Sequence, residues 1–220
     1  MHLSSAMRLT LAFMGLLLIS EPKAETVTVV DAKGQKVSDA VIELNRLTQS
    51  APKAVDAKDS VFIMDQLNKQ FVPELLIIPQ GAKVNFPNSD NIRHHVYSFS
   101  KAKPFELKLY SGQPKAPLTF EQAGVVVLGC NIHDSMVGYI YVAASRNVQR
   151  TNSEGQAELD LSALTPDSKL TIWHPLAQKG VQHLEHYSIA TLKQQGFQIT
   201  LSLTEPKPRN TFQELFGNEQ

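Results

Sequence analysis

Apolar and polar residues alternate over many short stretches of this chain, without the sustained 3.6-residue period of a long helix. Residues 105–110, FELKLY, are the clearest case, because every second position is apolar, as in a half-buried strand. Other short runs rich in Val, Ile and Phe are bounded by Gly, Pro, Asn or Ser and predict further strands. They are residues 26–30, 40–44, 61–64, 75–78, 83–86, 95–99, 117–120, 124–129, 138–142, 157–161, 170–174 and 197–203. Many short strands at this spacing predict an all-β protein built as a β-sandwich.

Composition sets limits on the classes of partner. The chain has 220 residues, of which 42% are hydrophobic and 19% charged, which is typical of a folded protein with one large or two small domains. Lys plus Arg and Asp plus Glu both number 21, so neither nucleic acid nor an anionic membrane is expected as a partner. The sequence also has no Gly-rich phosphate loop and no heptad repeat.

The first 24 residues have the pattern of a secretory signal peptide. Arg8 supplies positive charge, and residues 9–19 form an apolar run that is too short to span a bilayer. Cleavage is expected after Ala24, with cleavage after Ser20 and an uncleaved anchor as alternatives. No Cys follows the apolar run, which excludes a lipoprotein anchor. We therefore expect export to the periplasm, without stable membrane insertion after cleavage.

Cys130 is the only cysteine of the chain, although cysteines in an oxidising compartment usually occur in pairs. A lone Cys is either a buried apolar residue or a residue with a chemical role. His133 and Met136 follow it at intervals of three residues, and His94 lies near an earlier expected strand. A thiolate, two imidazoles and a thioether are the donor set of blue copper sites. This grouping favours a metal site over a plain core cysteine, with a gap-filling core residue as the lesser alternative for Met136.

The first imidazole ligand is ambiguous, because His94 and His95 are adjacent. Neighbouring residues of a strand point to opposite faces, so only one of the two can face the metal.

Residues 71–142 resemble a cupredoxin, most closely the amicyanin type, on the strength of two segments. One is the Cys-x-x-His-x-x-Met spacing, and the other is VNFPNSDNIRHHV, which resembles the strand and loop that deliver the first His. The wider pattern is similar to exported bacterial proteins called methylamine-utilisation or plastocyanin-like proteins. The resemblance implies a Greek-key sandwich holding one type 1 copper ion through His94, Cys130, His133 and Met136.

The same resemblance favours His94 over His95, because a strand ending in Asn precedes the ligand by six residues, as Asn88 precedes His94. It places His95 at a position usually held by an Asn that ties the two ligand loops together. The alternative, His95 as ligand, would put Phe99 at the core position expected after the ligand.

The two flanks resemble a carboxypeptidase-regulatory or transthyretin-like β-sandwich, in VTVVDAKGQKVSDAVIELN and TNSEGQAELDLSALTPDSKLTIWHP. We therefore expect a signal peptide at 1–24, flanking strands and a loop at 25–60, a copper domain at 61–146, the remaining flanking strands at 147–205 and a polar tail at 206–220.

The expected function is that of a single-electron carrier that exchanges electrons with redox partner proteins in the periplasm. It is not expected to be an enzyme, because the motif implies no open coordination position and has no paired acid and base beside it. One alternative is copper carriage or storage in the cell envelope. Another is a β-sandwich module with a structural or binding role and no redox function.

Overall fold

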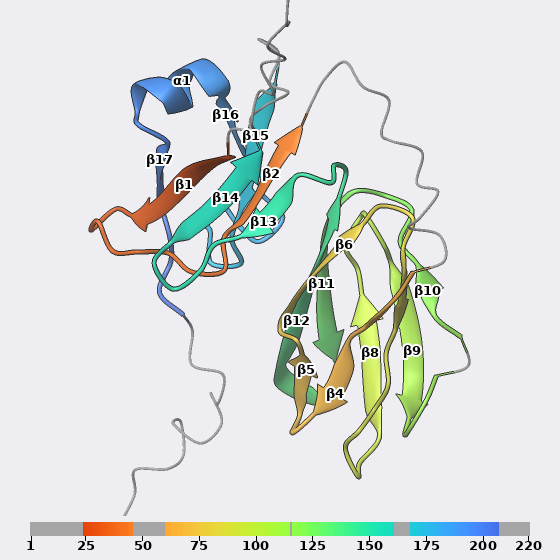
Figure 1. The fold of residues 1–220 in the computed structure, drawn as a ribbon. Helices are drawn as coiled ribbons and strands as arrows, with labels where there is room; N and C mark the ends of the chain where they lie inside the picture. Colours follow the sequence, from red (N-terminus) through yellow and green to blue (C-terminus); the bar gives the residue numbers. More distant parts are fainter. Residues whose placement is uncertain (1–23, 46–59, 115, 161–167, 207–220) are drawn as a thin grey trace, which may run out of the picture.

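The computed structural model describes residues 24–45, 60–114, 116–160 and 168–206 (Figure 1). The expected signal peptide before Ala24, most of the polar segment that follows the second strand, and the tail from residue 207 lie outside these residues. Within the described residues, no helix is long and apolar enough to cross a membrane.

The described chain is almost entirely β-structure, which confirms the all-β prediction. Elements not expected from the sequence are the short strands β4 (Asp65–Leu67), β5 (Gln70–Val72), β13 (Val148–Arg150) and β16 (Glu185–Ser188), and the short helix α1 (Ile189–Gln194). The elements are β1 (Ala24–Asp31), β2 (Val41–Asn45), β3 (Val61–Ile63), β4 (Asp65–Leu67), β5 (Gln70–Val72), β6 (Leu75–Pro79), β7 (Lys83–Asn85), β8 (His94–Ser98), β9 (Phe105–Tyr110), β10 (Leu118–Thr119), β11 (Gly124–Cys130), β12 (His133–Ala143), β13 (Val148–Arg150), β14 (Gln156–Asp160), β15 (Lys169–Trp173), β16 (Glu185–Ser188), α1 (Ile189–Gln194) and β17 (Gln198–Leu201).

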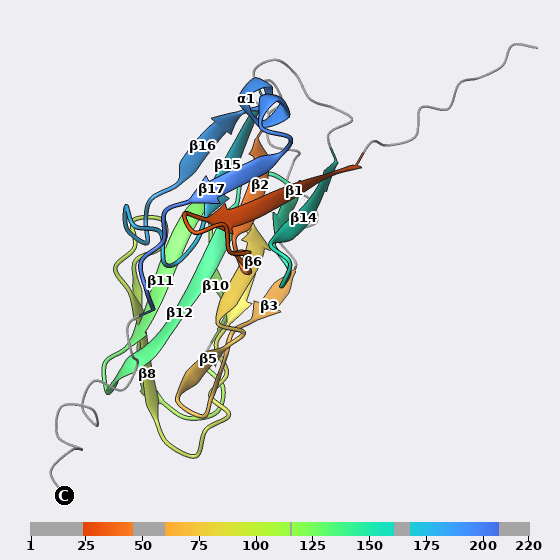
Figure 2. The ribbon, with the colours of Figure 1, turned by 90° about the vertical axis from the view of Figure 1, so that its left-hand side faces the viewer.

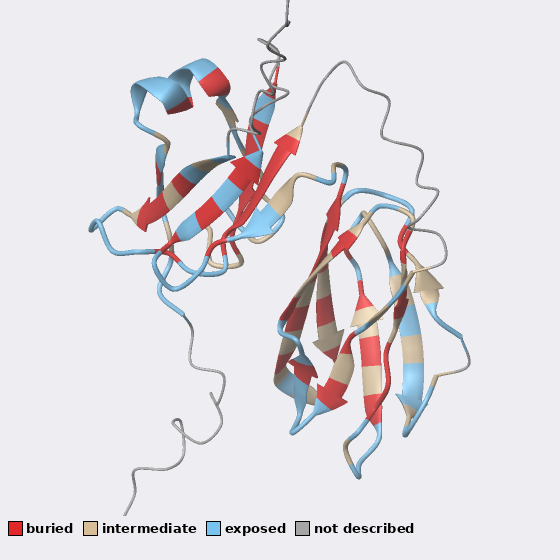
Figure 3. Cartoon of the chain, viewed as in Figure 1, coloured by how far each residue is buried: buried red, intermediate tan, exposed pale blue. Residues whose placement is uncertain are grey.

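A first sandwich is built from the middle of the chain. Its larger sheet has the strand order β6-β12-β11-β8-β9, and a smaller sheet has the order β10-β7-β3. Both sheets contribute to one core, in which Val84 of β7 and Phe86, directly after that strand, meet Val96, Leu128 and Ile140 of the larger sheet. Alternation puts one face of each strand in this core, as Figure 3 shows for β8 and β11.

The two ends of the chain together form a second, smaller sandwich. Strand β1 lies between β14, which is antiparallel to it, and β17, which is parallel (Figure 2). The facing sheet has the order β13-β2-β15-β16. A separate core that includes Val29, Ile42, Leu170 and Leu192 joins these sheets and α1. The exact domain limits, at residues 60, 146 and 205, stay a prediction.

A third apolar cluster joins the two sandwiches. Trp173 of β15 is 1% exposed, and its rings pack on Tyr139 and Tyr141 of β12 at centroid distances of 5.6 and 6.1 Å. Glu43 of β2 lies beside this cluster and is only 3% exposed. Its carboxylate accepts hydrogen bonds from the Tyr141 hydroxyl at 2.8 Å and from the Ser145 backbone N–H. The contact between the sandwiches is therefore mainly apolar, with one buried carboxylate.

We expect the stability of the protein to depend on pH through Glu43. Burial raises the pKa of its carboxyl more than hydrogen bonds from Tyr141 and Ser145 lower it. Because the folded state then binds more protons than the unfolded state, the free energy of unfolding falls as pH rises from 4.5 through the higher folded pKa. In Glu43→Gln this contribution is absent, so denaturation between pH 4 and pH 8 should show the variant gaining stability relative to the wild type as pH rises. Parallel stability curves would contradict the expectation.

A second substitution measures the hydrogen bonds of Glu43 apart from its charge. Glu43→Ala leaves the Tyr141 hydroxyl and the Ser145 N–H without their acceptor. An unsatisfied buried donor costs about 1–3 kcal/mol, so this variant should be clearly less stable than Glu43→Gln at every pH.

Candidate metal centre

The structure brings His94, Cys130 and His133 together at the end of the first sandwich that lies away from the flanking strands (Figure 1). Nδ1 of His94 and Nδ1 of His133 each lie 3.8 Å from Sγ of Cys130. The three candidate ligand atoms all lie within 4.8 Å of one another. His94 is fully buried, Cys130 is 3% exposed and His133 is partly exposed.

An irregularity in the β11–β12 ladder shapes one side of this site. Cys130 pairs with His133, whereas the next pair is Gly129 with Val137. Residues 134–136 therefore have no partner opposite them and form a bulge, a feature that re-aims side chains beside functional sites. Met136, the fourth expected ligand, is fully buried and belongs to the same core cluster as Cys130. The turn between β11 and β12 thus places His133 opposite Cys130, and the bulge that follows contains Met136.

These residues fit a copper ion. A first-row transition metal with bonds of roughly 2.0 Å to nitrogen and 2.3 Å to sulfur, at an angle of about 120°, holds those atoms about 3.7 Å apart. The observed separations of 3.8 Å from sulfur to each imidazole nitrogen agree with that geometry. Thiolate and thioether donors suit Cu(I), and imidazole suits either oxidation state, so the donor set favours copper.

The two adjacent histidines lie on opposite faces of β8, and only His94 faces Cys130. His94 points into the site, whereas Nε2 of His95 lies 2.9 Å from Oε1 of Glu106 on β9, without completing a well-aligned hydrogen bond. Phe99 is 87% exposed and so does not occupy the core position that the alternative required. At the position where the resemblance usually has an Asn that ties the ligand loops together, the ring of His95 contacts Glu106 on β9 and Tyr97 on β8.

Asp90 contacts His94, the first candidate ligand, although no sequence pattern singled it out. Nε2 of His94 lies 2.7 Å from Oδ2 of Asp90. Burial alone would raise the pKa of this carboxyl, but hydrogen bonds from the Lys69 N–H, His94 and the Asn68 N–H outweigh it and lower the pKa. The available signal was an acidic residue four positions before the first His, in a loop.

The loop that carries His94 is held in place by Asn88. Its side-chain amide donates to the carbonyl oxygens of Ile92 at 2.9 Å and Tyr110 at 2.8 Å. Its backbone N–H and C=O both bond to Gly112. The sequence singled out Asn88 because it precedes His94 by six residues. Its hydrogen bonds hold the loop in place and so fix where the loop positions His94.

The surroundings of His133 favour the neutral form of its imidazole over the protonated form. Its pKa is lowered by burial, then by the nearby His94 and Lys69, against a smaller opposing effect of Asp90. A metal competes with a proton for the imidazole nitrogen, so a lowered pKa favours metal binding at neutral pH.

Other histidines and methionines of the described chain have different partners and do not join the site. Met64 is a fully buried core residue, His186 bonds to the Thr171 hydroxyl at 3.0 Å, and Nδ1 of His174 accepts from the Leu176 N–H at 3.1 Å. Among the residues that the structure describes, His94, Cys130 and His133 form the one group of three or more His, Cys, Asp or Glu residues close enough to share an ion.

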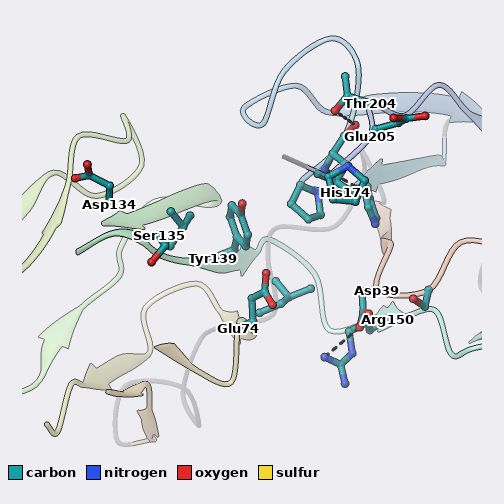
Figure 4. Close-up of a pocket in the computed structure, with 15 residues that line it drawn as sticks. Asp39, Glu74, Asp134, Ser135, Tyr139, Arg150, His174, Thr204 and Glu205 are labelled. Carbon is teal, nitrogen blue, oxygen red and sulfur yellow. Dashed lines mark hydrogen bonds and ion pairs between the residues drawn. The ribbon is translucent and has the colours of Figure 1, made fainter. Parts of the chain in front are cut away.

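A cavity of about 960 Å³ lies between the two sandwiches (Figure 4). It extends from Asp134 and Tyr139 on β12 to His174 and Glu205 of the second sandwich. Arg150 and Asp39 also line the cavity and form an ion pair with each other at 3.4 Å. The lining therefore carries more carboxylates than cations.

The solved structures that this chain is similar to include several copper proteins. A Cu-containing nitrite reductase from Thermus scotoductus matches at 26% identity over 38% of this chain, with a TM-score of 0.36. A reduced amicyanin variant matches at 22% identity over 46% of this chain and 98% of its own, with a TM-score of 0.34. A purple cupredoxin from Nitrosopumilus maritimus matches at 25% identity over 39% of this chain and 100% of its own, with a TM-score of 0.33. This chain spans only 22% of the nitrite reductase.

No protein family model and no curated protein matches the chain. The sheet orders and the two separate cores define the architecture, which is a β-sandwich with the His94, Cys130 and His133 cluster at one end, joined to a second, smaller β-sandwich.

Proposed function

We propose that this protein is a periplasmic type 1 copper protein that carries single electrons. Its copper is held by His94, Cys130, His133 and Met136. One observation carries the proposal. Two imidazole Nδ1 atoms and one thiol sulfur lie within 4.8 Å of one another, at a largely buried end of the sandwich.

The burial of these ligands suits electron transfer. When bound, copper supplies a one-electron couple, and the protein keeps its ligands in place in both oxidation states. His94, Cys130 and Met136 are held in the core or against it, so water and substrate have little access from the inner side. His133 is less buried than the other three residues, so its ring edge is proposed as the point at which electrons enter and leave.

The surface around this edge favours a transient protein partner. Leu67, Ile92 and Ile132 are 40%, 37% and 48% exposed. Ile132 precedes His133, Ile92 lies in the loop that leads to His94, and Leu67 borders the turn that binds Asp90. Exposed apolar residues at one place mark interaction surfaces, so a redox partner protein is proposed to dock here.

The first test is the visible spectrum of the protein with copper. Cu(II) added to the protein from Glu25 onward should give an intense band from thiolate-to-copper charge transfer, with one copper bound per chain. Cys130→Ser should abolish the band entirely, because a hydroxyl cannot replace the thiolate donor. His183→Ala, outside the site, is the matched control and should leave the band unchanged. A wild-type protein that binds no copper would rule out both the electron carrier and copper carriage.

A second candidate function is copper carriage in the cell envelope, which the exposed Asp134 beside His133 favours. A carboxylate next to a surface ligand gives an incoming or leaving copper ion an additional oxygen donor. A carrier should release Cu(I) to a chelator within seconds and show no intense band with Cu(II). An electron carrier should hold its copper through many oxidation cycles.

A further inference from the structure

The carboxylate of Asp90 joins the first candidate ligand to a hairpin that is not otherwise part of the site. Strands β4 and β5 pair around a two-residue turn, Asn68 and Lys69, whose φ angles are 54° and 58°. In this conformation both turn amides point at Asp90, with Asn68 N 2.7 Å from Oδ1 and Lys69 N 2.9 Å from Oδ2. The Asp90 side chain is only 11% exposed, and its Oδ2 also meets the fully buried His94. The carboxylate is thus fixed by the backbone, independently of any metal.

The contact determines which ring nitrogen of His94 carries the proton. An ionised carboxylate can only accept hydrogen bonds, so Nε2 of His94 must donate the 2.7 Å bond to Asp90. In a neutral imidazole the other nitrogen, Nδ1, then carries the lone pair. Nδ1 is the atom that lies 3.8 Å from Sγ of Cys130. The carboxylate therefore selects the tautomer that can bind a metal at this site.

We propose that Asp90 is a positioning residue of the copper centre, which holds Nδ1 of His94 towards the metal and favours Cu(II) over Cu(I) through its negative charge. The second part rests on the proposed copper function, whereas the first concerns the metal-free protein as well. A fixed anion next to a ligand stabilises the more positive ion, so the centre has a lower reduction potential with Asp90 than without it. The β4–β5 hairpin is then part of the copper site through its two amides.

The first experiment uses the metal-free protein. NMR of the His94 ring nitrogens should show the proton on Nε2 in the wild type and a mixture of both tautomers in Asp90→Ala. Asp65→Asn is the matched control, because Asp65 also ties the 86–90 loop to β4, but its carboxylate accepts from the Ser89 hydroxyl at 2.7 Å. It should leave the His94 tautomer unchanged, even if both variants are less stable than the wild type.

The second experiment measures copper affinity in both oxidation states. Asp90→Asn keeps one acceptor but loses the charge, so its Cu(II) affinity should fall about tenfold while its Cu(I) affinity changes little. For a one-electron couple, that ratio corresponds to a rise in reduction potential of about 59 mV. Asp90→Ala should weaken both states, within the roughly 10- to 100-fold range of partners that orient metal ligands.

Two results would overturn the proposal. One is an unchanged His94 tautomer in metal-free Asp90→Ala, which would refute positioning whatever the copper experiments show. The other is a potential in Asp65→Asn that rises as much as in Asp90→Asn, since the effect would then be one of loop stability or distant charge. If the wild type binds no copper but the tautomer still depends on Asp90, the proposed copper function fails and the positioning role stands.

Discussion

His94→Ala is expected to abolish the thiolate-to-copper absorption band, whereas His95→Ala is expected to keep it. His94 is fully buried, with Nδ1 3.8 Å from Sγ of Cys130. His95 lies on the opposite face of β8 and contacts Glu106. Removing His94 deletes a donor and leaves Asp90 without its imidazole partner. Removing His95 deletes a contact at the surface of the sheet.

The visible and electron paramagnetic resonance spectra of the two variants, recorded at equal copper loading, distinguish these outcomes. His95→Ala serves as the control for general loss of a β8 side chain. A band that survives in His94→Ala and disappears in His95→Ala would mean that the register of β8 is shifted by one residue, which exchanges the two faces of the strand.

Trp173→Ala is expected to give the largest loss of stability. The indole is 1% exposed, packs on Tyr139 and Tyr141, and donates from Nε1 to the Val181 carbonyl at 2.7 Å. Truncation of a buried Trp to Ala typically costs about 3–5 kcal/mol, through lost burial and the cavity that remains. Chemical denaturation of the metal-free protein measures this loss.

Trp173→Phe is the matched control for the same position. It keeps an aromatic ring against both tyrosines and loses the indole N–H, so it should cost clearly less than the alanine variant. The copper band should persist in both variants, because the ligands lie at the other end of the first sandwich. A loss below about 1 kcal/mol in Trp173→Ala would show that the contact between the sandwiches contributes little to stability.

Local patterns were sufficient to predict most of the strands. The alternation at residues 105–110 corresponds to β9, and the apolar run before Cys130 corresponds to β11. Strand β12 is longer than predicted, because its ladder with β11 continues past the bulge to His133. The first residues of β12 are polar and show no strand pattern of their own. They extend the strand because Cys130 of β11 pairs with His133.

The short helix α1 gave no periodic signal over its six residues. Its one local mark is Ser188, whose side chain accepts from the Thr191 N–H and caps the helix. Ile189 and Leu192 anchor it to the second core, so its stability comes from packing.

The candidate site was predictable only in part. Its candidate ligands stand at a recognisable spacing in the sequence, whereas the residues that hold them in place do not. Cys130, His133 and Met136 stand at regular intervals in the sequence. The six-residue interval from Asn88 favoured His94, and His94 is the histidine that faces Cys130. Asp90 acquires its role from the Asn68–Lys69 turn, which is distant in sequence and was not expected. Glu43 likewise looks like a polar strand residue until Tyr141 and Ser145 enclose it.

The pairing of β1 and β2 has a consequence for the order in which the molecule assembles. Both strands are synthesised first, yet β1 pairs with β14 and β17, and β2 pairs with β13 and β15. Asn45 must wait for Thr171, 126 residues later, before their side chains can bond. Contacts so distant along the chain form slowly, whereas the strands of the first sandwich are complete by Ala143. The middle sandwich can thus complete its core and bring His94, Cys130 and His133 together while the first two strands still have open edges.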